Sequence, residues 1–257
     1  MKPVFDSYAR YYDLLYQDKD YRAESEYIAN LLSKKLPKAE RLLELGCGTG
    51  AHAEQLANFG YFVHGIDLSE TMLKRAANRK SKLVKHIAQR LTFECGDIRD
   101  IQTSEQYDAV IALFHVISYQ TTNIDLSAVF NNAATQLHPG GLFIFDFWYG
   151  PAVLTQRPEV RVKRLEDEKI KVTRIAEPKM RINENVVEVN YSVFIESKAT
   201  GQVEQLQETH EMRYLFLPEL RSYLASAGFL EVSSSTWLTE QQLGTDSWAG
   251  LIVAIKL

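Results

Sequence analysis

The feature that most constrains the fold is a glycine-rich loop between a short apolar strand and a helix. The strand is predicted over Arg41–Leu45, the loop is Gly46-Cys-Gly-Thr-Gly50, and the helix follows over Ala51–Phe59. Glycine allows a tight backbone turn and lets a ligand lie against the main chain. This order of elements is typical of open α/β sheets, which bind ligands in the crevice at the carboxyl ends of their strands.

Strand and helix patterns keep alternating up to about residue 147. Further strands are predicted at residues 61–66, 91–95, 107–114 and 142–147, and helices at residues 69–79 and 125–137. Such alternation produces right-handed βαβ units whose strands lie parallel. The sequence therefore predicts a parallel sheet with helices on both faces.

The pattern changes after Pro151. Apolar and polar side chains alternate over Val187–Ile195 and again over Leu206–Phe216, which predicts half-buried antiparallel strands. A helix over Pro218–Ala227 and two last strands then complete the parallel sheet. The predicted fold is thus α/β, with a mostly parallel seven-stranded sheet and an antiparallel β layer inserted over residues 151–217.

The first 37 residues are distinct from the rest. Five tyrosines crowd a polar stretch at their start: Tyr8, Tyr11, Tyr12, Tyr16 and Tyr21. An amphipathic helix follows over Glu24–Leu36 and stops at Pro37. We expect residues 1–37 to form a lid segment, with a lid helix over the ligand site, within a single domain of residues 1–257.

The composition excludes several classes of protein. The 257 residues are 46% hydrophobic and carry a net charge of −4, which suits a cytoplasmic globular protein and argues against a nucleic-acid binder. No apolar run approaches the ~18 residues of a membrane span, and we expect no signal peptide. Cys47 and Cys95 are too few for a disulfide framework or a four-ligand metal site, so no metal is expected.

Three carboxylates follow strands at the same edge of the predicted sheet. Glu44 comes just before the loop, Asp67 ends the second strand, and Asp97 follows the third. The loop also fits the dinucleotide fingerprint, but a carboxylate beside a pyrophosphate is repulsive. S-adenosylmethionine instead carries an ammonium and a sulfonium, so Glu44 favours this methyl donor.

The other two carboxylates suit the adenosyl part of the same ligand. Asp67 can accept hydrogen bonds from both ribose hydroxyls. Asp97 can accept from an adenine amino group, with Ile98 as an apolar edge. Each acid alone could be a helix N-cap or a solvated turn residue, but the set together with the glycine loop favours a ligand site.

Four ordered motifs resemble those of class I S-adenosylmethionine-dependent methyltransferases, whose sheet is Rossmann-like. They are Glu44–Gly50, Gly65–Ser69, Cys95–Ile98 and Leu137–Leu142. A wider set resembles the N,N-dimethyltransferases of nucleotide-linked amino-deoxysugars: Tyr12–Tyr16, Lys19–Tyr21, Phe114–Tyr119, Asp146–Trp148, Glu188–Tyr191 and Glu208–Glu211. The chain departs from that family in a shorter stretch before Lys19, over Lys80–Gln89, and at its C-terminal end.

The resemblance implies S-adenosylmethionine as the cofactor. The predicted cofactor-binding residues are Tyr16, Tyr21, Glu44, Gly46, Cys47, Gly48, Gly50, His52, Asp67, Leu68, Met72, Asp97, Ile98 and Leu113. The rings of Tyr16 and Tyr21 suit a sulfonium through cation–π attraction, or they only hold the N-terminal segment to the body. His52 contacts the methionine carboxylate or is merely a polar residue of the first helical turn.

An amine acceptor must lose a proton when it is methylated, so general-base help is expected. Tyr119, after the fourth strand, and His210, on an inserted strand, are the catalytic candidates, because the resemblance places both at the acceptor. His210 shares the parity of Leu206 and Met212, so it could equally be a core histidine. The predicted acceptor-binding residues are Tyr12, His115, Asp146 and Trp148, of which His115 is a third candidate base.

These observations predict an enzyme that transfers methyl from S-adenosylmethionine to an amino nitrogen of a small molecule, with a nucleotide-linked amino sugar as the leading acceptor. The alternatives within enzymes are an O-methyltransferase of small molecules and an N-methyltransferase of a free amine or peptide amino terminus. A silent adenosyl-binding module and a nicotinamide dehydrogenase are the rivals from other classes. No nucleic-acid or membrane partner is expected, and monomer and homodimer both stay open.

Overall fold

The structure of the protein is a computed structural model that describes residues 11, 12 and 14–257. Tyr8 and the beginning of the predicted lid segment lie outside the described residues. Residues 11, 12, 14 and 15 are helical, and α2 (Tyr21–Lys35) follows after its N-cap Asp20. The side chain of Asp20 accepts a hydrogen bond from the N–H of Ala23, which satisfies one free donor of the first turn.

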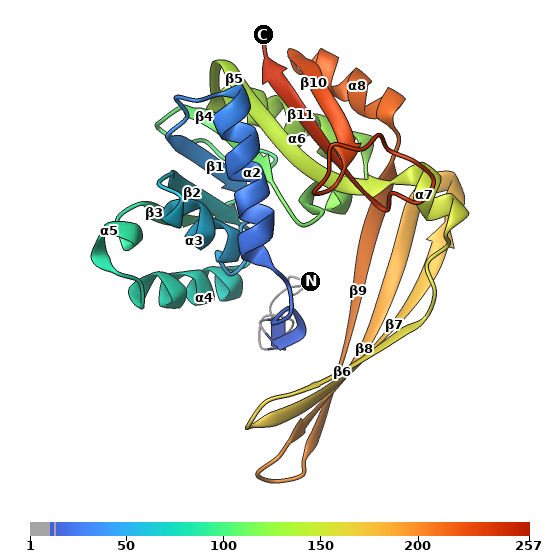
Figure 1. The fold of residues 1–257 in the computed structure, drawn as a ribbon. Coiled ribbons are helices and arrows are strands. Elements are labelled where there is room, and N and C mark those ends of the chain that lie inside the picture. The colour runs from blue at the N-terminus through green and yellow to red at the C-terminus, as the bar shows by residue number, and fades with distance from the viewer. Residues whose placement is uncertain (1–10, 13) are drawn as a thin grey trace.

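Seven strands form the mostly parallel sheet that the sequence predicts (Figure 1). In order across the sheet they are β3 (Leu91–Cys95), β2 (Phe62–Asp67), β1 (Arg41–Leu45), β4 (Tyr107–Ala112), β5 (Leu137–Tyr149), β11 (Ala249–Lys256) and β10 (Phe229–Thr236). Strand β11 runs antiparallel to β5 and β10, and the other neighbouring pairs are parallel. The carboxyl ends of β1 to β5 therefore meet along one edge.

Helices cover both faces of this sheet, because successive residues of a strand point to opposite sides. Leu42 of β1 packs in one core cluster with Ile28 of α2 and Leu56 of α3. Leu43 points the other way and packs with Phe130 of α6. The helices after α2 are α3 (Ala51–Asn58), α4 (Glu70–Ser81), α5 (Lys85–Ala88), α6 (Asn123–Gln136), α7 (Gly150–Thr155) and α8 (Leu217–Ser226), with the short 3-10 helices η1 (Val116–Tyr119) and η2 (Ile182–Glu184).

The inserted β layer is an antiparallel sheet of long strands. Its strands are β6 (Arg161–Glu166), β7 (Ile170–Arg181), β8 (Val186–Ser197) and β9 (Val203–Leu215). Strand β9 also pairs with the end of β5, where Trp148 and Tyr149 lie opposite Tyr214 and Leu215. The insert thus extends from the carboxyl edge of the main sheet (Figure 1), and its Val172 and Val193 pack with Met72 of α4.

Strands β6 and β7 were not predicted from the sequence. Val172 is the one fully buried apolar side chain of β7. Apolar residues at positions 170, 172, 176, 178 and 180 do alternate with polar ones, but Arg174 and Ile175 interrupt the alternation, and the prediction did not use this signal. The predicted turn at His138–Gly141 lies instead inside β5, where the pairing with β4 is irregular between Tyr107 and Ala109. Gly140, with φ of 80°, accommodates that irregularity.

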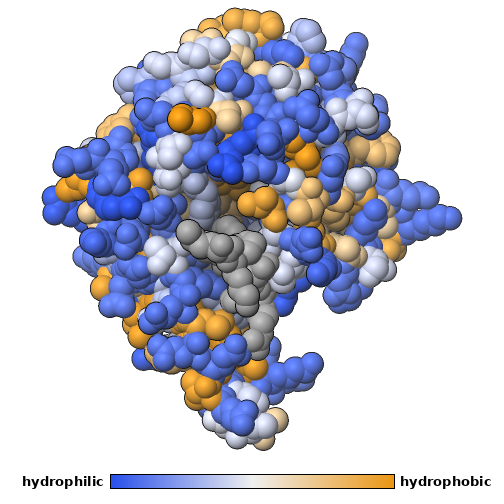
Figure 2. All heavy atoms as spheres, turned by 180° about the vertical axis from the view of Figure 1, so that it is seen from behind, coloured by the Kyte–Doolittle hydropathy of each residue, from blue (hydrophilic) through white to orange (hydrophobic). Residues whose placement is uncertain are grey.

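Hydrophilic side chains cover most of the molecular face seen in Figure 2, and hydrophobic ones are scattered between them. The exposed large hydrophobic residues include Leu68, Val84 and Val160, which lie in three different loops, and Val203 of β9. No helix in the described part of the chain is long and apolar enough to cross a membrane.

Candidate active site

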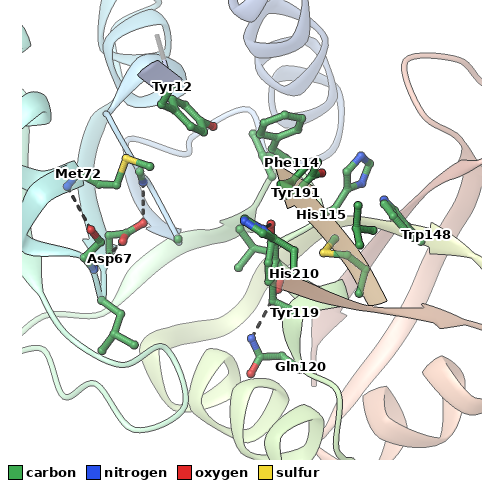
Figure 3. A pocket seen from close by; sticks show the side chains of 18 of the residues that line it. Tyr12, Asp67, Met72, Phe114, His115, Tyr119, Gln120, Trp148, Tyr191 and His210 are labelled. Atoms are coloured by element: carbon green, nitrogen blue, oxygen red, sulfur yellow. Dashed lines mark hydrogen bonds between the residues drawn. The ribbon is translucent and has the colours of Figure 1, made fainter. Parts of the chain in front are cut away.

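A cavity of about 990 Å³ lies between the carboxyl edge of the main sheet and the insert. The main sheet contributes residues that follow four strands, such as Gly46, Asp67, Asp97 and Leu113. The insert contributes one face of three neighbouring strands: residues 174, 176 and 178 of β7, 189 and 191 of β8, and 210 and 212 of β9. Figure 3 shows Asp67 and Met72 on one side of the cavity and Tyr119, Trp148 and His210 on the other.

Most of the predicted site residues come together around this cavity. It is lined by Tyr12, Tyr16, Gly46, Gly48, Asp67, Leu68, Met72, Asp97, Ile98, Leu113, His115, Tyr119, Trp148 and His210. Tyr21, Cys47 and His52 line a much smaller cavity beside it, of about 30 Å³, which shares the wall of Gly46 and Gly48. Glu44, Gly50 and Asp146 line neither cavity and lie behind the residues that do.

Each of the three glycines in the loop has a positive φ, a backbone conformation that favours glycine. The φ angles are 69° at Gly46, 54° at Gly48 and 71° at Gly50. A Cβ atom at Gly46 would come within 2.6 Å of a methyl of Val116, and one at Gly50 within 2.7 Å of Phe93. At Gly48 it would meet nothing within 4 Å, so the main chain there is open to a ligand.

Asp67 fixes the loop to the end of β2. Its Oδ2 accepts from the N–H of Gly48 and its Oδ1 from the N–H of Ser69, both at 2.8 Å. Burial raises the pKa of this carboxyl, and the two N–H groups partly offset that effect. Each oxygen keeps capacity for another donor, so ribose hydroxyls suit this position in the cavity wall.

Glu44 is buried directly beneath the loop, with 2% of its surface exposed. Burial, reinforced by the negative charge of Asp67, raises its pKa to about 8. Its Oε1 lies 3.8 Å from Nδ1 of His52, whose Nε2 is 2.8 Å from Glu24. Glu24 in turn contacts Lys19. Glu44 lines neither cavity, and with a pKa of about 8 it holds its proton at neutral pH, so the attraction to a cation that the sequence predicts for this residue stays a prediction.

Asp97 is engaged by Arg99, whose Nε lies 2.9 and 3.0 Å from its two oxygens. These hydrogen bonds lower the pKa of Asp97. Arg99 also donates to Asp125 at 2.7 Å. Asp97 and Ile98 therefore meet the cavity as part of an ion-pair network, and the adenine contact of Asp97 stays a prediction.

The N-terminal segment packs over the cavity through aromatic rings. The Tyr16 ring lies edge-on to Phe114 at 5.0 Å and 4.8 Å from Tyr12. Tyr21 lies edge-on to His52 at 4.9 Å. Tyr11 donates a hydrogen bond of 3.0 Å to Oε2 of Glu208 on β9. The segment thus connects the loop side of the cavity with the insert.

Tyr119 and His210 form a hydrogen-bonded pair, although 91 residues separate them in the sequence. The Oη of Tyr119 lies 2.9 Å from Nδ1 of His210, and Nε2 of His210 lies 3.6 Å from Oε2 of Glu208. The ring of Tyr191 stands edge-on to His210 at 4.9 Å. Burial raises the pKa of Tyr119 well above its ordinary value, so its hydroxyl keeps its proton.

His115 and Asp146 form a second polar pair at the cavity. The N–H of His115 donates to both oxygens of Asp146, at 3.0 and 3.1 Å. The Nδ1 of the ring lies 2.7 Å from Oδ2, a close ion-pair contact without hydrogen-bond alignment. Asp146 is 1% exposed, and the His115 ring lies edge-on to Trp148 at 6.2 Å.

Sequence reasoning missed much of the wall that the insert provides. The missed residues include Gln156, Pro158, Arg161, Arg174, Ala176, Pro178, Val189, Tyr191, Met212 and Trp248. Strand β6 carries no periodic signal, and the alternation of apolar and polar residues in β7 is interrupted at Arg174 and Ile175. Met212 lies two residues after His210 on β9, so both side chains point to the same face of the strand. The alternation of apolar and polar residues in the sequence was the signal that could have identified Met212 as a cavity residue.

Comparisons with known proteins place the chain among methyltransferases. Residues 42–141 match the family model described as a methyltransferase domain. The chain is 34% identical, over 56% of its length and 58% of the relative's, to a dTDP-3-amino-3,4,6-trideoxy-alpha-D-glucopyranose N,N-dimethyltransferase of Streptomyces venezuelae. It is 31% identical, over 72% of its length and 70% of the relative's, to a dTDP-3-amino-3,6-dideoxy-alpha-D-glucopyranose N,N-dimethyltransferase of Streptomyces fradiae.

Solved structures agree with these matches. An S-adenosylmethionine-dependent methyltransferase of Clostridium acetobutylicum superposes with a TM-score of 0.81 at 21% identity, covering 99% of both chains. DesVI of Streptomyces venezuelae superposes with a TM-score of 0.80 at 25% identity, covering 97% of this chain and 98% of that one. The sequence match spans little more than half of the Streptomyces venezuelae relative, at 58%, and of a Saccharopolyspora spinosa relative, at 55%. The chain belongs to the S-adenosylmethionine-dependent methyltransferase family.

Proposed function

We propose that this protein transfers methyl groups from S-adenosylmethionine to the amino nitrogen of a nucleotide-linked amino sugar. The observation that carries the proposal is the shared cavity, in which the glycine loop and Asp67 line one side and the Tyr119–His210 pair lines the other. The relatives named as dTDP-amino-sugar N,N-dimethyltransferases support this class of acceptor.

The residues on the loop side fit the methyl donor. Gly48 offers open main chain, Asp67 has spare acceptor capacity for ribose, and Leu68 and Met72 give apolar surface. The donor supplies a methyl group on a positively charged sulfur. The ring of Tyr16, which lies edge-on to Phe114 and already has Nζ of Lys163 at 5.9 Å from its centroid, is of the kind that attracts such a charge.

The residues on the insert side position the acceptor and take its proton. Methyl transfer is an in-line displacement, so fixing the amine against the methyl group lowers most of the barrier. We place Tyr119 at the amine, where its oxygen accepts the N–H proton while its own proton passes to Nδ1 of His210. Glu208 then faces the imidazolium from 3.6 Å.

The N-terminal segment and the insert complete the proposal by enclosing both ligands. Tyr12 and Tyr16 line the cavity from the segment of residues 1–37, and Tyr191 and Met212 line it from the insert. Covering the cavity from these two sides limits the water that would otherwise solvate the amine. Of the predicted lid segment, residues 1–37, the part before α2 reaches the cavity, whereas α2 packs on a face of the main sheet. We therefore assign the lid to the part before α2 and the acceptor wall to residues 151–217.

The test is the product spectrum of a panel of amines and alcohols. The purified protein, S-adenosylmethionine and a dTDP-amino sugar are expected to give products heavier by about 14 and 28 mass units, the masses of one and two methyl groups, on nitrogen. Tyr119→Phe and His210→Ala are each expected to lower kcat by about 10²-fold or more, with unchanged affinity for S-adenosylhomocysteine.

Two outcomes would contradict this assignment. A single methyl on oxygen would mean that the protein is an O-methyltransferase. Methylation of free amines but not of nucleotide-linked amino sugars would mean that the acceptor is a free amine. If both variants kept full turnover, the proton would leave without the Tyr119–His210 pair. Lys34→Ala, on exposed α2, is the matched control and should leave kcat unchanged.

A further inference from the structure

We propose that His115, oriented by Asp146, is a second proton acceptor at this site, apart from the Tyr119–His210 pair. The inference rests on the proposed methyl transfer to an amine. Three observations carry it: a strained backbone at His115, a carboxylate buried behind its ring, and a ring edge that lines the cavity (Figure 3).

The backbone at the end of β4 adopts an unusual conformation. Phe114 and His115 are consecutive non-glycine residues with φ of 67° and 64°, a region that side chains disfavour. The N–H of His115 donates to Asp146, and its carbonyl accepts from the N–H of Ser118 at 2.9 Å, which holds the turn. Strain that neighbours hold in place beside a cavity points to a function.

The carboxylate of Asp146 sets the direction of the His115 ring. Asp146 is shielded from water, and Nδ1 of His115 is buried against it at 2.7 Å. A small ring rotation aligns the Nδ1–H with Oδ2, and the imidazole then has the tautomer with a free lone pair on Nε2. His115 lines the cavity beside Trp148, and its side chain is 23% exposed although Nδ1 is buried. We infer that the exposed part is the ring edge that carries Nε2.

The reaction releases protons from the amine, and the His115 ring can accept one of them. The amine lone pair forms the nitrogen–carbon bond while the carbon–sulfur bond breaks, its electron pair staying on sulfur. One N–H proton must leave for each methyl added, and a twice-methylated amine releases two. The Tyr119–His210 pair takes one of these protons, and we assign the other to Nε2 of His115, where the carboxylate of Asp146 stabilises the imidazolium until the proton passes to solvent.

Because of this backbone conformation, His115→Gly can remove the side chain without straining the main chain. Glycine suits φ of 64°, so His115→Gly removes the ring without disturbing the turn and leaves a space that imidazole can fill. We expect His115→Gly to melt at or above the wild-type temperature, to lose about 10²-fold in kcat, and to regain activity severalfold with added imidazole. His86→Ala, at an exposed position on α5, should show neither the loss nor the rescue.

A measurement without any ligand gives an independent readout. In ¹⁵N-histidine spectra of the protein alone, His115 should show the Nδ1–H tautomer, and Asp146→Asn should change it. Wild-type kcat in His115→Gly, a loss that imidazole does not restore, or an Nε2–H tautomer of His115 would each overturn the assignment. Failure of the proposed function looks different, because the wild-type protein would then form no N-methyl product.

Discussion

Glu44 shows how one buried group makes the fold depend on pH. Its pKa rises from 4.5 to about 8, mainly through burial, so the folded protein binds this proton more tightly than the unfolded chain does. The stability from that proton is fully present below pH 4.5 and is lost as the pH rises through 8. Above pH 8 the folded protein contains the buried, ionised carboxylate of Glu44, which destabilises it.

We therefore expect Glu44→Gln to be more stable than wild type at high pH. The gain in Tm should be small at pH 4, grow with pH, and level off above pH 8 at roughly 2–6 °C, measured by differential scanning fluorimetry. Glu40→Gln, at an exposed position, is the control and should show no pH-dependent gain. A gain that does not vary with pH would mean that ionisation of Glu44 is not the cause.

The sequence predicts which residues line the cavity best at positions where the chemistry requires one residue type. Gly46, Gly48 and Asp67 stand out because tight turns and ligand hydroxyls need them, and all three lie on the cavity. The pairing of Tyr119 with His210 could not be predicted, since it depends on how the insert folds back onto η1. Asp146 behind His115 depends likewise on the register of β5 beside β4.

At the scale of elements, burial decides what can be predicted. Strands β1 and β3 begin and end at the predicted residues, because a short apolar run with turn residues on both sides fits only one placement of a strand. Strand β4 ends at Ala112 rather than at Phe114, because the backbone of Phe114 and His115 leaves the extended region. Strand β6 has no periodic pattern, and the alternation in β7 is weakened because Arg174 lies on its apolar face and Ile175 on its polar face.

The N-terminal segment is the element whose attachment should matter for turnover. Tyr11→Phe removes its 3.0 Å hydrogen bond to Glu208, which joins residues 197 apart in sequence. We expect a loss of about 1–3 kcal/mol in the free energy of unfolding and a fall in kcat of roughly 3–10-fold, with donor affinity changed less than about twofold.

A matched control separates attachment from general destabilisation. Tyr27 of α2 donates a comparable hydrogen bond of 2.7 Å to the carbonyl of Thr239, far from the cavity walls. Tyr27→Phe should lower stability without lowering kcat at a temperature where both variants are folded. Equal kcat values for the two variants would show that the Tyr11 contact serves stability alone.

At the scale of the whole molecule, donor binding should raise stability and reveal which cofactor fits. A ligand that binds only the folded protein adds about 2.7 kcal/mol at a concentration about 100 times its Kd. S-adenosylmethionine and S-adenosylhomocysteine are therefore expected to raise Tm by about 5–10 °C. NADH should leave it unchanged, because the carboxylate of Asp67 at the loop already accepts from the N–H of Gly48 and would repel a pyrophosphate. A larger shift with NADH would overturn the donor assignment.

Strand β9 meets β5 through only two residue pairs, at Trp148 and Tyr149. This short seam is where the main chains of the insert and the main sheet pair, and side chains join the two halves as well: Leu215 of β9 packs in a core cluster of the main sheet, and Met72 of α4 packs with Val172 of β7. An evolving gene could exchange the strands that meet the acceptor and leave the cofactor machinery intact. One ancestral fold would in this way supply enzymes for many acceptors, each new specificity arising beyond the seam.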